Sequence, residues 1–128
     1  SHANQAGMAD KLWKDVSEGM GSFLDDLREH DVSDNVVVMM FTEFGRRTRD
    51  NGSGTDHGAA GAAFMFGDGV KGGQYSEFPS LEEKNLEQGD VIPNYDYRGL
   101  YTSILEDWLD LDAKPIVEGI YEKLPILS

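Results

Sequence analysis

An apolar run that is followed at once by polar, glycine-rich residues is the feature that most constrains what this chain can fold into. Residues 36–41 read Val-Val-Val-Met-Met-Phe. A continuous run of this kind is typical of a strand buried on both faces of a parallel sheet. We therefore predict a strand over residues 36–42. Ligands of open α/β sheets bind just beyond the carboxyl ends of such strands, so the polar residues that follow are the first candidates for a functional site.

Two other segments have the spacing of amphipathic helices. Apolar side chains recur every three or four positions over residues 4–30 and again over residues 97–109. This spacing predicts two helices that pack on the sheet through one apolar face each. Asp96 suits the N-cap of the second helix, and Pro115 suits the first turn of a short terminal helix. The first stripe comprises Met8, Leu12, Val16, Met20, Phe23, Leu24 and Leu27.

The segment between the predicted strands is rich in glycine. Residues 45–61 hold five glycines and predict a long loop, and loops of this length are usually functional or disordered. Residues 62–66 form a second short apolar run, which predicts another strand. Two helices and two or three strands would leave the edges of a parallel sheet exposed. We therefore expect residues 1–128 to be a single domain or a fragment, the C-terminal part of a larger α/β protein.

Composition excludes several classes of function. The chain has 11 basic and 24 acidic side chains, a formal net charge of −13, so it lacks the basic face that nucleic-acid binding needs. It has no cysteine, which excludes disulfides and thiolate metal sites. No apolar run approaches the roughly 20 residues that span a bilayer. We expect a globular protein without nucleic-acid partners or a membrane span.

Carboxylate and imidazole side chains follow the predicted strand. Glu43 comes directly after it, and Asp56 and His57 lie in the glycine-rich segment, where Gly54 and Gly58 allow the backbone to turn. Mixed oxygen and nitrogen ligands suit zinc, manganese or iron better than magnesium. We predict that these residues bind a divalent metal. The alternative is that Glu43 caps a loop in solvent and that the Asp-His pair is a surface motif.

Two arginines follow Glu43 closely in the sequence. Arg46 and Arg47 follow the predicted strand end, and arginine binds phosphate or sulfate through a planar fork of donors. We predict that one of them binds an oxyanion. In a chain this acidic, the alternative for each is a salt bridge.

Several motifs resemble an uncharacterised bacterial family of sulfatase-like proteins, the domain of unknown function numbered 1501. They include Thr-Glu-Phe-Gly-Arg-Arg and Asn-Gly-Ser-Gly-Thr-Asp-His-Gly. The motifs lie at residues 1–5, 42–47, 51–58, 67–75 and 97–109. Family members carry Asp-Thr-His or a close variant at the first of these, so the resemblance implies that His2 is a further metal ligand. The resemblance runs along the whole chain, which corresponds to the C-terminal part of the family's usual protein.

The resemblance implies a fold and an activity. The family is placed with the alkaline phosphatase-like proteins, which implies the C-terminal portion of a three-layer α/β/α sandwich, with helices packed on a small, mostly parallel sheet. It also implies metal-assisted attack of a nucleophile on a phosphate or sulfate ester. The nucleophile would lie in the remaining N-terminal part of the same protein, so the isolated chain should be inactive. Family members often carry a twin-arginine export signal, which implies a periplasmic or cell-surface location, although no such signal is visible in this chain.

Two other functions remain compatible with the sequence. The chain could be a non-catalytic binding or surface scaffold, because function does not follow from fold. It could also be an interaction domain whose acidic surface binds calcium or a basic partner. A nucleophile and a metal-binding aspartate upstream would favour the enzyme over both.

Overall fold

The computed structural model describes residues 1–127, which form two compact units. Unit 1 comprises residues 1–68 and 80–92, and unit 2 comprises residues 69–79 together with those from 93 onward. The candidate site residues all belong to unit 1.

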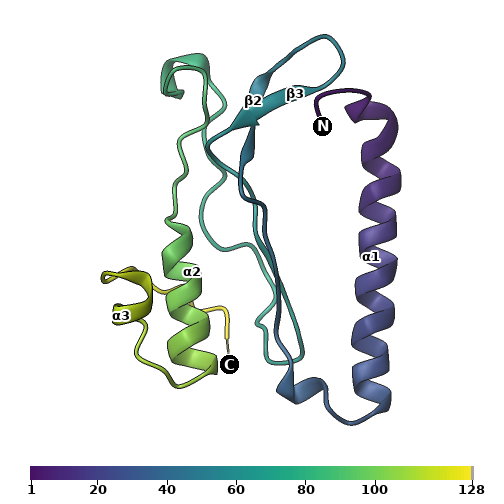
Figure 1. The fold of residues 1–128 in the computed structure, drawn as a ribbon, viewed down its shortest axis with the longest axis vertical. Coiled ribbons are helices and arrows are strands. Elements are labelled where there is room, and N and C mark those ends of the chain that lie inside the picture. The colour runs from purple at the N-terminus through teal and green to yellow at the C-terminus, as the bar shows by residue number, and fades with distance from the viewer. Residues whose placement is uncertain (128) are drawn as a thin grey trace. The chain divides into compact units, whose positions relative to one another are not determined.

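A single long helix dominates unit 1. Helix α1 (Gln5–Glu29) confirms the helix that the apolar stripe predicts, with bounds one residue inside those expected (Figure 1). None of its residues is buried, and four of the seven side chains of its stripe are exposed, for example 49% for Leu12 and 45% for Phe23, while the other three are half-buried. Trp13 meets the edge of Phe64 with 5.6 Å between ring centroids, and Arg28 pairs with Asp68 near the other end of the helix. The helix therefore forms as expected, but most of its apolar face is uncovered.

The predicted parallel sandwich is wrong. Strand β1 (Val38–Met40) pairs antiparallel with β4 (Phe64–Phe66), and the two form a sheet of only two strands. Both strands are consequently edges, and the side chains of β1 are half-buried while Phe41 is 60% exposed. An apolar run reveals that a strand can be covered on both faces, but it does not reveal the direction of its partner. The expectation of a central strand over residues 36–42 fails for that reason.

The segment predicted as a long loop is a β-hairpin. Strand β2 (Gly45–Asp50) pairs antiparallel with β3 (Thr55–Gly58). At its open end Gly45 faces Gly58, and a Cβ on Gly45 would collide with the carbonyl oxygen of Ala60. These two glycines therefore serve a close approach of backbones rather than a flexible loop.

Short 3₁₀ turns complete unit 1. They are η1 (Ser33–Asn35), directly after α1, and η2 (Glu83–Asn85), in the segment that returns to this unit.

No helix among the described residues is long and apolar enough to cross a membrane, which agrees with the expectation from hydropathy.

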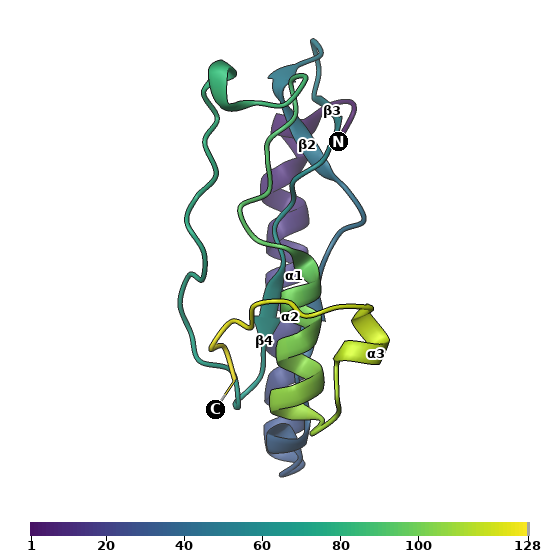
Figure 2. The same ribbon diagram turned by 90° about the vertical axis from the view of Figure 1, so that its left-hand side faces the viewer.

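Unit 2 is built around a second helix. Helix α2 (Tyr97–Ser103) continues as a π-helix, η3 (Ile104–Trp108), and α3 (Lys114–Val117) follows (Figure 2). The predicted cap is confirmed, because the side chain of Asp96 accepts a hydrogen bond from the backbone N–H of Arg98. The buried apolar side chains of this unit are Leu100, Ala113, Val117, Ile126 and Leu127.

A buried serine joins the C-terminal segment to α2. The hydroxyl of Ser103 donates to the carbonyl oxygen of Gly99 at 2.9 Å and accepts from the backbone N–H of Leu124 at the same distance. Ser103 is fully buried, and both of its hydrogen-bonding functions are satisfied. The segment is thereby fixed against α2.

Candidate functional site

The site is organised by the turn of the β2–β3 hairpin. The backbone N–H of Asn51 donates to the carbonyl oxygen of Gly54 at 2.9 Å, and Gly52 takes the positive φ of +100° that the turn requires. The Oδ1 atom of Asn51 accepts from the backbone N–H of Ser53 at 3.2 Å and from that of Gly54 at 2.9 Å. Asparagine and glycine are the usual residues of such turns, because they tolerate positive φ and bond to nearby backbone.

The N-terminal segment lies against this turn (Figure 1). The backbone N–H of Thr55 donates to the carbonyl oxygen of Ser1 at 3.0 Å, and that of Gln5 donates to the carbonyl oxygen of Ser53 at 3.1 Å. A Cβ on Gly54 would collide with Ser1, so a glycine is needed for this contact. The hairpin turn thus fixes the residues that lead into α1.

His2, Asp56 and His57 meet at this contact. Nδ1 of His2 lies 3.3 Å from Oδ1 of Asp56, although 54 positions separate them in the sequence. The rings of His2 and His57 lie 4.6 Å apart between centroids. Three of the four predicted metal ligands are therefore neighbours, and all three side chains are exposed.

The surroundings shift the pKa values of two of these groups in the directions that suit a metal ligand. A hydrogen bond from Asn51 is the main cause that lowers the pKa of the Asp56 carboxyl, and a hydrogen bond from His2 is the second. Partial desolvation is the main cause that lowers the pKa of His57, and the positive charges of His2 and Arg46 add to it. Both shifts favour the deprotonated form, which is the form that binds a cation.

The fourth predicted ligand, Glu43, stands apart from this group. It lies in the coil between β1 and β2, it is exposed, and it makes no hydrogen bond within residues 1–127. Its negative charge acts on His57, whose pKa it raises slightly against the stronger lowering effects. Glu43 therefore contributes charge to the site rather than a contact.

Arg46 has a structural role in the hairpin. Its Nη1 atom donates to the carbonyl oxygen of Thr55 at 2.8 Å, and its guanidinium lies 5.2 Å from the centre of the Phe44 ring. Phe44 in turn stacks on His57, with 3.5 Å between ring centroids. Phe44, directly before β2, thus packs on His57, and one donor of the Arg46 guanidinium is used within the hairpin.

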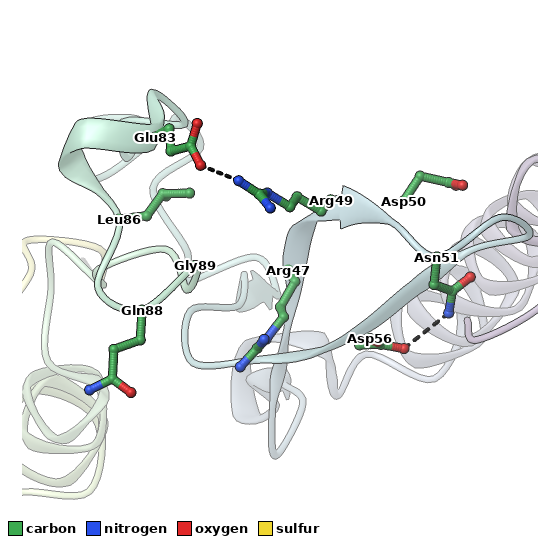
Figure 3. Close-up of a pocket in the computed structure, with 9 residues that line it drawn as sticks. All are labelled: Arg47, Arg49, Asp50, Asn51, Asp56, Glu83, Leu86, Gln88 and Gly89. Carbon is green, nitrogen blue, oxygen red and sulfur yellow. Dashed lines mark hydrogen bonds and ion pairs between the residues drawn. The ribbon is translucent and has the colours of Figure 1, made fainter.

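Arg47 is placed differently and points into a hollow of about 420 Å³ (Figure 3). Its Nε atom lies 3.3 Å from Oδ1 of Asp90. That oxygen atom is shielded from solvent and has no hydrogen bond within the described chain. No residue among 1–127 forms a hydrogen bond with either Nη atom of Arg47. This arginine is therefore anchored through one edge of its fork and free at the other.

Asp56 also lines this hollow. Arg49, which also lines it, is engaged by an ion pair with Glu83. The free edge of a guanidinium can bind an anion. If a cation is held by a carboxylate nearby, the same anion can also coordinate that cation. The full lining is Arg47, Arg49, Asp50, Asn51, Asp56, Glu83, Leu86, Gln88 and Gly89.

The described residues bring together side chains of the types that bind metals, but they do not form a metal site. Two imidazoles and a carboxylate are suitable donors for zinc, manganese or iron. Within residues 1–127, however, no group of three or more histidine, aspartate or glutamate side chains is arranged to hold a metal ion. The donor types fit a metal, and their number and arrangement fall short of a full shell.

Sequence reasoning missed three residues that build this site. Asn51 lies in the segment that the sequence predicts as a loop, Phe44 appears only within a motif, and Asp90 is not among the predicted site residues. The Asn-Gly pair at residues 51–52 could have indicated the hairpin, since this pair is typical of two-stranded turns. Asp90 carries no local signal, because its role depends on the tertiary position of Arg47.

Comparison with known proteins identifies one family. A family model described as "Protein of unknown function (DUF1501)" matches residues 1–112, which include the N-terminal segment and the whole hairpin. No curated protein and no solved structure matches the chain. The expected membership of family 1501 is confirmed, whereas no link to sulfatase-like or alkaline phosphatase-like proteins emerges from these comparisons.

Proposed function

This chain belongs to the DUF1501 family, and we propose that it is the C-terminal part of a metal-dependent hydrolase of phosphate or sulfate esters. The observation that carries it is the meeting of His2 with Asp56 and His57, which brings two imidazoles and a carboxylate together from distant parts of the sequence. The motif resemblance to sulfatase-like proteins supports the same reading.

In this proposal the chain supplies part of a metal shell. His2 and His57 would bind through neutral imidazole nitrogens, and Asp56 through its carboxylate. The remaining ligands and the nucleophile would come from the N-terminal part of the same protein. A bound divalent ion would polarise the ester oxygen and offset the charge that develops on it.

Arg47 is our candidate for the oxyanion. Its free Nη atoms would donate to the non-bridging oxygens of the phosphate or sulfate group, while Asp90 holds the guanidinium from behind. Arg46 is less suited to this role, because its guanidinium already donates to Thr55 and lies over Phe44.

A non-catalytic binding or surface module is the second candidate. The absence of a complete ligand group within residues 1–127 favours it. So does the pairing of Arg49 with Glu83, which leaves a single free guanidinium edge in the hollow. Under this reading, the same hollow would bind an anionic ligand without turnover.

Hydrolysis of aryl phosphate and aryl sulfate, measured with added zinc or manganese, tests the proposal. The longer protein should turn over at least one ester, and Asp56→Asn should lower kcat/KM by about two orders of magnitude, the scale for loss of a charge-stabilising group. The 128-residue chain should be inactive, because catalysis of this type needs a nucleophile as well as a metal. Robust turnover by the chain alone would refute the idea that the site is shared between this chain and the N-terminal part of the protein. An inactive longer protein that retains metal would favour the binding module.

A further inference from the structure

We propose that Asn51 is a positioning residue whose side-chain amide holds Asp56 and the N-terminal segment together, so that His2 and Asp56 meet only when that segment is docked. The inference deepens the proposed function and rests on it where metal binding is concerned. Its structural part, the coupling of docking to the carboxylate, can be tested without any metal.

The amide of Asn51 uses its full hydrogen-bonding capacity. As described above, its Oδ1 atom accepts from two backbone N–H groups of the turn. Its Nδ2 atom donates to Oδ1 of Asp56 at 3.0 Å and to the carbonyl oxygen of His2 at 3.2 Å. The opposite orientation of the amide would place its oxygen against a carboxylate and a carbonyl, so the network determines how the side chain is oriented.

The two donors of Nδ2 reach two different parts of the candidate site. One bond fixes the carboxylate of Asp56, and the other fixes the backbone of His2, whose ring lies against the same carboxylate. The two bonds thus span residues that are far apart in the sequence. Loss of these two bonds should free the N-terminal segment and the carboxylate at the same time.

The docked segment has few other anchors. Besides the two backbone bonds of Ser1 and Gln5, the hydroxyl of Ser53 accepts from the backbone N–H of Asn4 at 2.8 Å, and the hydroxyl of Thr55 donates to the side chain of Gln5. All of these contacts are made by the turn or the residue after it. The geometry of the turn, which Asn51 organises, therefore determines where His2 lies.

Hydrogen exchange of the metal-free chain tests the coupling with Asn51→Asp. The new carboxylate can still accept from the turn amides but can no longer donate, so it separates the two roles of the side chain. We expect the amide of Thr55, which bonds to Ser1, to exchange about tenfold faster, while the amide of Gly54 keeps its rate. Asn85→Asp is the matched control. Asn85 lies in η2 and donates from its side-chain amide to the hydroxyl of Ser80, so the replacement removes an equivalent donor and should change neither rate.

Two results of that experiment would overturn the proposal. An unchanged rate at Thr55 would show that the Nδ2 bonds do not hold the segment. Equal acceleration at Thr55 and Gly54 would show that Asn51 only builds the turn.

Manganese broadening of the histidine ring signals then tests the link to the ligand set. Mn²⁺ should broaden His2 and His57 together in the unaltered chain, with His30 as the internal reference. In Asn51→Ala, which adds no new ligand, His57 should broaden without His2. Equal broadening of both rings in the variant would contradict the positioning role. Failure to broaden either ring in the unaltered chain would instead refute the metal proposal, and the exchange rates would still decide the role of Asn51.

Discussion

Adjacent residues of one motif have different roles in this protein. Arg46 and Arg47 are neighbours in sequence, but they point to opposite faces of β2, as successive side chains of a strand do. One guanidinium lies over Phe44 and donates to the hairpin, whereas the other enters the hollow. The sequence indicates that one of the two binds an anion, but the choice depends on the strand that sequence reasoning treated as a loop.

His57 should titrate below the ordinary histidine pKa of about 6.5. Desolvation beside Phe44 is the main cause, and the positive charges of His2 and Arg46 lower the pKa further. Because the folded state disfavours the charged form, this group contributes stability above pH 6.5 and loses it as the pH falls through the lowered pKa. The ring-proton shifts of His57, followed by NMR against pH, measure the value, and a midpoint at or above 6.5 would contradict the arrangement described.

Helix α1 and the β2–β3 hairpin were predicted with unequal success, for a physical reason. The helix has an apolar stripe with a period of three to four residues, which local sequence is sufficient to reveal. The hairpin strands consist mainly of charged residues and glycine, so no alternation of apolar and polar side chains marks them. What makes them strands is the Asn-Gly turn and the close approach of Gly45 to Gly58, and the second of these is visible only in three dimensions.

Glycine replacements should distinguish these two elements. Gly21→Ala in α1 should raise the free energy of unfolding by about 0.5–1 kcal/mol, because alanine favours the helix and its Cβ meets no neighbouring atom. Gly45→Ala in β2 should lower it by about 1–3 kcal/mol, because its Cβ would collide with Ala60. Denaturant unfolding followed by circular dichroism measures both. A loss of stability in Gly21→Ala would indicate that this part of the helix surface is covered.

The core of unit 2 is smaller than its apolar sequence suggests. The apolar spacing over residues 97–109 predicts a packed face that includes Leu105 and Trp108, yet both are only half-buried, whereas Leu100 is 9% exposed. Leu100→Ala should therefore cost about 2–5 kcal/mol, the usual scale for emptying a core site. Ile120→Ala is a suitable control, because Ile120 is 86% exposed and should change stability by less than about 0.5 kcal/mol. Similar losses for the two variants, measured by chemical denaturation, would contradict this assignment of the core.

At the scale of the whole molecule, the predicted architecture is wrong, whereas the predicted site stays a prediction. The Asp-His pair, the arginines and the N-terminal histidine all belong to unit 1, and three of the predicted metal ligands lie together there. The antiparallel pairing of β1 with β4 was not predictable from an apolar run, and the exposed face of α1 was not predictable from its stripe. Both depend on which surfaces are covered, and periodicity records only which surfaces can be covered.

Zinc binding by calorimetry tests the central claim, that His2, Asp56 and His57 form part of one metal site. The titration belongs at about 0.15 M salt, where the non-specific attraction of an acidic chain for cations is largely screened. His57→Ala should weaken binding about tenfold or more, whereas His30→Ala, which removes the histidine at the end of α1, should not alter it. Affinity should also fall as the pH drops through the histidine range near 6.5, because protons compete for the imidazoles. The titration uses the longer protein, which would supply the remaining ligands. Equal affinity in its His57→Ala variant and the unaltered longer protein would show that these residues form no metal site, and the binding-module reading would replace the hydrolase.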